Sequence, residues 1–310
     1  MENITQTPVR FGAGEGLFGM LTSPRDQTSS PTACLMFNMG ANHRVGPRRI
    51  NVKLAHALAA EGVSSMRFDL GGIGDSQPLK MSRSVQARAV HCIKAAMDVA
   101  QEQLGARQFV IVAMCSGVAQ SMQVAVEDPR VIGLSLFDGF SFPEWRARLQ
   151  RNVRRAFAVS WHPAFRGKAV RWLRRRFTND EANTPMPDIF PEEISRDESL
   201  IRTRQQLQQL VDRRVGVQLL YSGSLCANDR GLDQLGLLAR EPFAHLLDYR
   251  FMRDVDHTVC TASGQQIFLK TVGNWVTDRA FKGEAGQCEL ARGLTEAGLK
   301  FSPGLAVPSQ

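Results

Sequence analysis

The segment Phe109-Val-Ile-Val-Ala-Met-Cys115-Ser116-Gly117-Val118 joins an apolar run, typical of a buried β-strand, to a reactive side chain flanked by small residues. Where a strand turns sharply into a helix and presents a nucleophile, small residues are needed two positions before and after it. The backbone at the nucleophile is strained, and larger neighbouring side chains would collide. Ala113 and Gly117 meet this requirement when Cys115 is the nucleophile. We therefore predict a nucleophile turn centred on Cys115.

The adjacent Ser116 fits this pattern less well. If it were the nucleophile, Met114 and Val118 would stand where small residues are required. The structural alternative is that Cys115 is an unreactive buried thiol at a strand end, since free cysteine is among the most buried residue types. The two interpretations differ in whether an acid and a histidine accompany the cysteine.

Composition favours one large domain in a reducing compartment. The chain has 310 residues, of which 43% are hydrophobic, enough for one extensive core. The first residues, 1–6, lack a charged and then apolar signal pattern, and no apolar run reaches the length of a membrane span. The six cysteines are far apart, without a C-x-x-C pair, which argues against a zinc ribbon or a disulfide scaffold. We expect a cytoplasmic protein with free thiols and no metal.

Strand and helix patterns alternate through most of the chain, which favours an α/β fold with a mostly parallel sheet and helices on both faces. We predict a hairpin over 9–22 and later strands and helices in alternation. The predicted strands are 33–37, 62–69, 109–114, 131–137, 215–222 and 246–252, and the predicted helices end near 60, 104, 127 and 276. The alternation stops between 141 and 213, where prolines interrupt short helical patterns. We therefore expect a core formed by 1–140 and 214–282, a helical cap inserted at 141–213, and a tail at 283–310.

The net charge of +8 is concentrated in the predicted cap. Residues 144–177 contain eleven basic side chains and one acid, a net charge of +10, so the rest of the chain is slightly negative. Such a surface could attract an acidic partner, with the run Arg174, Arg175 and Arg176 as the strongest candidate for docking. The alternative is a pair of solvated amphipathic helices. No nucleic-acid-reading motif accompanies the charge, so nucleic acid is not expected as a partner.

Over roughly residues 8–280 the chain resembles the α/β-hydrolase superfamily. The nucleophile turn is one basis for the resemblance, and Asp69-Leu-Gly-Gly-Ile-Gly-Asp-Ser76, similar to that superfamily's D-x-x-G-x-G-x-S turn, is another. The superfamily keeps the order nucleophile, acid, histidine. His257 lies after the last predicted strand, where the resemblance places the catalytic base. In the loop after 215–222 we choose Asp229 as the acid, with Asp233 as the alternative.

The resemblance also implies donors for an oxyanion. One is the backbone N–H of Ser116, and the other comes from the loop after the strand 33–37, at Met39 or Gly40. The neighbouring Asn42, His43 and Arg44 could either hold this loop or touch the substrate. The helix that begins at Gly117, together with the histidine, is expected to lower the pKa of the Cys115 thiol.

A cysteine nucleophile narrows the expected chemistry. It exchanges readily with thioesters, and an S-acyl enzyme can pass its acyl group to water or to a carbanion or amine in the same molecule. Relatives that use cysteine include dienelactone hydrolases and Dieckmann-type cyclases. We expect acyl transfer through Cys115, Asp229 and His257, without a cofactor, from a substrate carried by an acyl carrier protein or coenzyme A. Two alternatives stay open, a small-molecule ester or lactone hydrolase and a non-catalytic binding protein with this fold.

Overall fold

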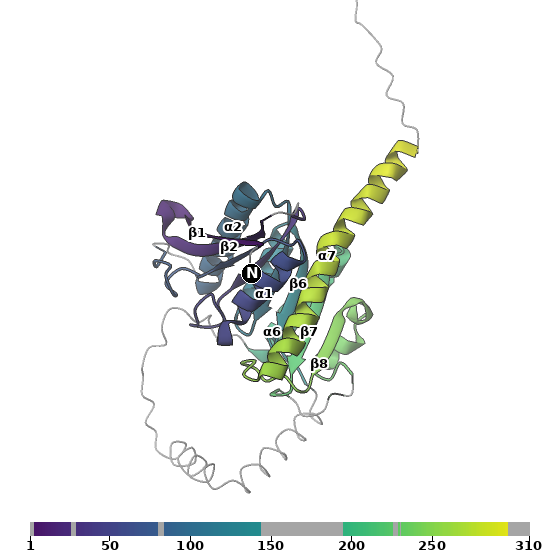
Figure 1. The fold of residues 1–310 in the computed structure, drawn as a ribbon. Coiled ribbons are helices and arrows are strands. Elements are labelled where there is room, and N and C mark those ends of the chain that lie inside the picture. The colour runs from purple at the N-terminus through teal and green to yellow at the C-terminus, as the bar shows by residue number, and fades with distance from the viewer. Residues whose placement is uncertain are drawn as a thin grey trace, which may run out of the picture.

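The computed structural model describes residues 3–25, 29–79, 84–143, 195–225, 229 and 231–296, with the backbone alone described for 282–296. Figure 1 shows one layered α/β body with a long C-terminal helix. The strands are β1 (Ile4–Phe11), β2 (Leu17–Pro24), β3 (Thr32–Phe37), β4 (Ser65–Phe68), β5 (Gln108–Met114), β6 (Val131–Phe137), β7 (Gly216–Ser222) and β8 (Asp248–Met252). The helices are α1 (Ile50–Ala60), α2 (Val85–Leu104), α3 (Gly117–Glu127), α6 (Arg196–Asp212) and α7 (Ala262–Glu296).

The eight strands form a single mixed sheet in the order β1-β2-β4-β3-β5-β6-β7-β8. The β1–β2 hairpin is antiparallel and joins β4 in antiparallel fashion, whereas the pairs from β4 to β8 are parallel. Every residue of β3 and nearly every residue of β5 is buried, as expected for central parallel strands covered on both faces. The α/β-hydrolase fold predicted from the sequence is confirmed.

The helices divide between the two faces of the sheet. Side chains of α2, α3 and α6 share one apolar cluster, and those of α1 and α7 share the other. In the sheet, β4 lies on one side of β3 and β5 lies on the other, so the direction in which successive strands are added reverses between β3 and β5. The loops at the carboxyl ends of parallel strands form a crevice at such a reversal, and the segments after β3 and β5 meet there.

Two expectations about the chain's organisation need revision. Within the range 141–213, α6 packs on the core, where Leu207 and Leu210 are fully buried. The cap residues 144–194, including Arg174, Arg175 and Arg176, lie outside the described residues. The last helix is also longer than predicted and runs to Glu296. Isolated glycines such as Gly283 cost a helix about 1 kcal/mol each but do not end it, and no proline occurs between Ala262 and Pro303. Within the described ranges, no helix is both long and apolar enough to cross a membrane.

Candidate active site

The turn between β5 and α3 has the strained geometry that the sequence predicted. Cys115 adopts a left-handed backbone conformation with φ of 51°, which is uncommon for a residue other than glycine, whereas Ser116 has ordinary helical angles. A Cβ on Gly117 would lie only 2.9 Å from the ring of Phe37, so a small residue is required there. The strained residue in the described turn is therefore Cys115 and not Ser116.

The histidine and its acid come from two strand ends beyond β5. The Nδ1 atom of His257, in the loop after β8, lies 2.8 Å from Oδ2 of Asp138, the residue that follows β6. The Asp138 side chain is fully buried, and its other oxygen accepts a hydrogen bond from the N–H of Ser222 at 2.8 Å. The ring of His257 stacks on Phe137, with the centroids 6.4 Å apart. With Nδ1–H donated to the carboxylate, Nε2 is left to act as a base.

The expected contact between Asp229 and His257 is not found, because the Asp229 carboxylate is engaged elsewhere. It accepts hydrogen bonds from the hydroxyl of Tyr249 and from the N–H of Gly231. Asp233, the alternative, is likewise not the partner of His257 among the described residues. The sequence prediction placed the acid in the loop after β7, whereas the carboxylate bonded to His257 follows β6. A signal for it exists, an aspartate directly after the apolar strand Val131–Phe137, next to the nucleophile strand.

The backbone of Cys115 is bonded to the strand end that carries this acid–histidine pair, and no hydrogen bond between its Sγ and His257 is found among the described residues. The Cys115 N–H donates to the carbonyl of Phe137 at 2.8 Å, and Phe137 both precedes Asp138 and stacks on His257. Burial raises the pKa of the Cys115 thiol, the N–H of Ser116 opposes this shift, and the Asp138 charge raises the pKa further. The expectation of a lowered pKa is therefore wrong. The resting site favours a neutral thiol that needs a base to become a thiolate.

Candidate donors for an oxyanion lie on the other side of Cys115. The Ser116 N–H lowers the pKa of the adjacent thiol, the effect expected of a donor close to the sulfur. Of the two alternatives in the loop after β3, Gly40 donates its N–H to Oγ of Ser116 at 2.8 Å. No hydrogen bond within the described ranges engages the N–H of Met39. This leaves Met39 as the better candidate for the second donor.

Asn42, His43 and Arg44 hold this loop. Asn42 donates from its backbone and its side chain to the carbonyl of Met39, at 3.1 and 3.0 Å. Nη1 of Arg44 lies 2.5 Å from Asp69 and 2.6 Å from Asp75, and its guanidinium stacks over the ring of Phe18. These bonds tie the loop after β3 to the turn after β4. Of the two roles predicted for the three residues, their contacts match that of holding the loop.

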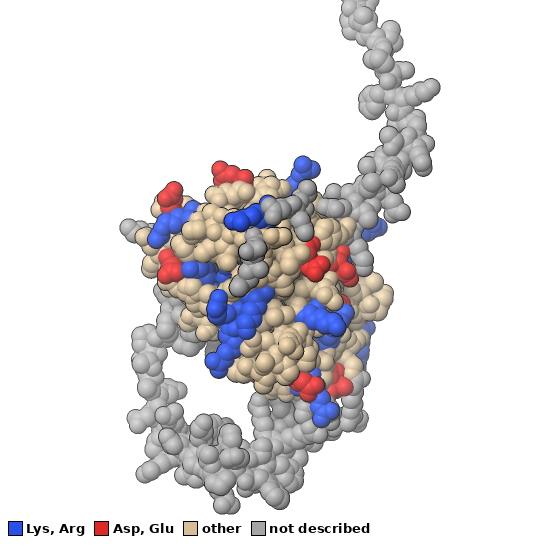
Figure 2. All heavy atoms as spheres, in the orientation of Figure 1, with Lys and Arg blue, Asp and Glu red and all other residues tan. Residues whose placement is uncertain are grey.

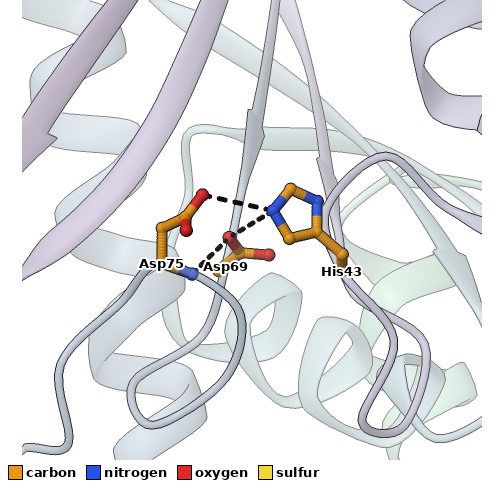
Figure 3. Close-up of side chains that lie close together, drawn as sticks. All are labelled: His43, Asp69 and Asp75. Atoms are coloured by element: carbon orange, nitrogen blue, oxygen red, sulfur yellow. Dashed lines mark hydrogen bonds and ion pairs between the residues drawn. The ribbon is translucent and has the colours of Figure 1, made fainter.

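The Gly-rich turn 69–76 depends on its glycines. Gly74 has φ of 56°, and a Cβ there would lie within 2.4 Å of the Asp69 carboxylate. Figure 3 shows His43, Asp69 and Asp75 facing one another, an arrangement that could hold a metal ion. Arg44 Nη1 lies between the two carboxylates, however, and provides the positive charge that a metal would bring. This group, with Arg44, is called the arginine cluster below.

Comparisons with known proteins support the fold and leave the activity open. No protein-family model and no curated protein matches the chain. Among solved structures it is similar to an esterase from Pyrococcus furiosus, with a TM-score of 0.53, 10% identity, and coverage of 89% of this chain and 92% of that one. It is also similar to the esterase domain of a Rhodothermus marinus protein, with a TM-score of 0.50, 17% identity, and coverage of 88% and 98%. The class defined by these likenesses and by the described sheet is the α/β-hydrolase fold.

Proposed function

We propose that the protein is an acyl-transfer enzyme that forms an S-acyl intermediate on Cys115 from a thioester or an ester. The observation that carries the proposal is the His257–Asp138 pair, which lies beside a cysteine held in the strained conformation of a nucleophile turn. Asp138 replaces Asp229 as the proposed acid. A non-catalytic binding protein would not need a buried carboxylate that fixes the tautomer of a half-exposed histidine.

The proposed reaction follows from the hydrogen-bond pattern. Nε2 of His257 takes the thiol proton as Sγ of Cys115 attacks the substrate carbonyl, and the carbonyl oxygen becomes an oxyanion near the N–H groups of Ser116 and Met39. The carbon–heteroatom bond then breaks, and His257 returns the proton to the leaving group. Water attacks the S-acyl carbonyl in the second half, giving its proton to His257, which passes one back to Cys115. An internal carbanion or amine in place of water would close a ring instead.

The raised pKa of the thiol bears on this mechanism. Because burial and the Asp138 charge both disfavour the resting thiolate, proton transfer to His257 must accompany the attack. Once the proton has moved, the same carboxylate stabilises the imidazolium. Asp138 therefore disfavours a free thiolate while favouring the thiolate–imidazolium pair that reacts.

The experiment is intact-mass analysis after incubation with a thioester and an oxygen ester of the same acid. We expect an acyl adduct, and turnover, with the thioester first. Because some of the similar solved structures are esterases, the oxygen ester is the second substrate class to test. Cys115→Ala should abolish both adduct and turnover, a loss of at least about 10³-fold, because no nucleophile remains. The matched control is Ser116→Ala, which keeps the backbone N–H and should retain most turnover of an unsubstituted acyl thioester. The proposal fails if Cys115→Ala stays active or if neither substrate acylates the protein.

A carrier-linked substrate is the more specific part of the proposal, and it rests on the charge of residues 144–177 in the sequence. An acidic carrier protein or the phosphates of coenzyme A would be attracted to such a segment. The Debye length falls from about 10 Å at 0.1 M salt to about 3 Å at 1 M. We therefore expect kcat/KM for a carrier-bound thioester to fall steeply with salt while that for a short uncharged thioester changes little. Equal salt sensitivity of the two substrates would exclude charge-based docking.

A further inference from the structure

A small cavity of about 40 Å³ lies directly beside the nucleophile turn, between α2, the first turn of α3 and the loops after β3 and β4. Ser116 and Gln120, one helical turn apart on α3, supply two of its polar groups. Residues at this spacing lie on the same face of a helix. A water molecule needs about 10–15 Å³ of such space, so the cavity admits a group of two or three heavy atoms.

Gln120 is the unusual residue in this cavity. Its side chain is only 5% exposed, and its Oε1 has no hydrogen-bond partner among the described residues. Leaving a buried acceptor unsatisfied costs about 1–3 kcal/mol, so such atoms in a native protein call for an explanation. A hydrophobic residue would line the cavity without this cost. The amide is therefore suited to a ligand that brings a donor.

Ser116 contributes the complementary group. Its Oγ accepts the N–H of Gly40 at 2.8 Å, which uses one lone pair, and no described residue accepts the hydroxyl proton. Two other polar side chains of the lining have partners already, since Asn38 is bonded to Gly40 and Leu70, and Arg88 has a partner of its own. The groups left without a partner among the described residues are therefore a donor, the Ser116 O–H, and an acceptor, Gln120 Oε1. An alcohol matches both, because a hydroxyl accepts one hydrogen bond and donates another. A carboxylate has no proton to donate to the amide oxygen, and an alkyl group would leave both polar groups unpaired.

We infer that this cavity is a subsite for a hydroxyl group of the substrate, close to the scissile carbonyl, and that Gln120 is the specificity-determining residue that recognises it. Ser116 follows Cys115 directly, so a hydroxyl held there lies within a few bonds of the reacting carbon. A 2-hydroxy or 3-hydroxy acyl group would meet this condition, and so would a short leaving group that carries a hydroxyl. The inference rests on the proposed function and adds a substrate class to it.

The test compares butyryl, 2-hydroxybutyryl, 3-hydroxybutyryl and 3-oxobutyryl thioesters of one short thiol. Butyryl thioesters of ethanethiol and 2-mercaptoethanol then distinguish a hydroxyl on the acyl side from one on the leaving group. We expect at least one hydroxylated substrate to exceed its unsubstituted partner about tenfold in kcat/KM, the effect of one satisfied hydrogen bond. In Gln120→Met, which keeps the volume but removes the acceptor, this ratio should fall to about one.

Gln123→Met is the matched control on the same helix. Gln123 is bonded to Glu127 and Gln206 and does not line the cavity, so its replacement should keep the tenfold ratio. A hydroxyl preference that survives in Gln120→Met, a ratio of one in the unmodified protein, or a preference for the 3-oxo substrate would each overturn the inference. If no thioester acylates Cys115 at all, the proposed function has failed instead, so the two failures are distinguishable.

Discussion

Two buried carboxylates lie on opposite sides of β5 in the sheet, one after β4 and one after the adjacent β6, and they have different kinds of partner. Asp69, after β4, is fully buried and bonded to the guanidinium of Arg44 and to the backbone N–H groups of Arg44 and Asp75. Asp138, after β6, is equally buried, but its partner is the half-exposed imidazole of His257. A guanidinium stays charged at any ordinary pH, whereas an imidazole gains and loses a proton near neutrality. The first pair can therefore only hold a loop, and the second can move a proton.

The Asp69–Arg44 pair and the Asp138–His257 pair also contact different segments of the site. The arginine cluster ties the loop after β3, with the candidate oxyanion donor Met39, to the turn after β4. Both oxygens of Asp138 are directed toward the other side of Cys115, one to His257 and one to the N–H of Ser222. Loss of the first pair should therefore affect stability and donor placement, and loss of the second should affect the chemical step. Three predictions test this division, from the largest effect to the smallest.

Asp138→Asn should produce the largest change in activity. An amide in this position no longer fixes the tautomer that exposes Nε2 of His257, nor does it stabilise the imidazolium, so kcat should fall by about 10³- to 10⁴-fold. Thermal unfolding should show that the variant is folded. The matched control is Asp229→Asn, which removes a carboxylate bonded to Tyr249 and should change kcat by less than about threefold. If Asp229→Asn lowered kcat more than Asp138→Asn did, Asp229 would be the acid after all.

Arg44→Met should have a smaller effect, and on stability first. It leaves the carboxylate of Asp69 buried without its cation, and breaking a buried pair in this way costs about 3–5 kcal/mol of unfolding free energy. The Arg44 side chain is only 11% exposed, so solvent offers little compensation. Urea denaturation measures the loss, and the double variant Arg44→Met/Asp69→Asn should recover part of it. Arg204→Met is the comparison, because it breaks an ion pair with Glu241 in which the arginine side chain is 59% exposed, and it should cost about 1 kcal/mol or less. An equal cost for the two arginines would contradict a structural role for the cluster.

The sequence predicted more of the fold than of the site. The apolar runs located the described strands, and the small residues at Ala113 and Gly117 located the turn, because both are local patterns with a direct steric meaning. The acid, by contrast, could not be identified from a local sequence pattern. Asp138 and Asp229 each follow a buried strand, and only the order of the strands and the bond to His257 distinguish them. The loop-holding role of Arg44 was open for the same reason, since its partner Asp69 lies 25 residues away.

The prediction of a lowered thiol pKa took account only of the two influences that the sequence shows, and both of them favour the thiolate. The start of α3 and a nearby histidine favour a thiolate, and the sequence shows both. It does not show that Cys115 is half-buried or that the nearest carboxylate is Asp138. In the structure, burial and that negative charge outweigh the N–H of Ser116. This reversal leads to the last prediction.

Alkylation of Cys115 by iodoacetamide should be slow at neutral pH and should rise with pH beyond the range of an ordinary cysteine. Only the thiolate reacts, and a raised pKa means that a smaller thiolate fraction exists at any pH below it. Because the Asp138 charge contributes to this shift, Asp138→Asn should lower the thiol pKa, move the pH profile downward and accelerate alkylation at pH 8. The variant that loses most of its catalysis should therefore carry the more reactive thiol. Peptide mapping at Cys115 measures this rate separately from that at the exposed Cys260, which forms no disulfide with another described cysteine and serves as the internal reference. Slower alkylation in Asp138→Asn would contradict this prediction. It would mean that the carboxylate promotes the thiolate through His257 even without substrate.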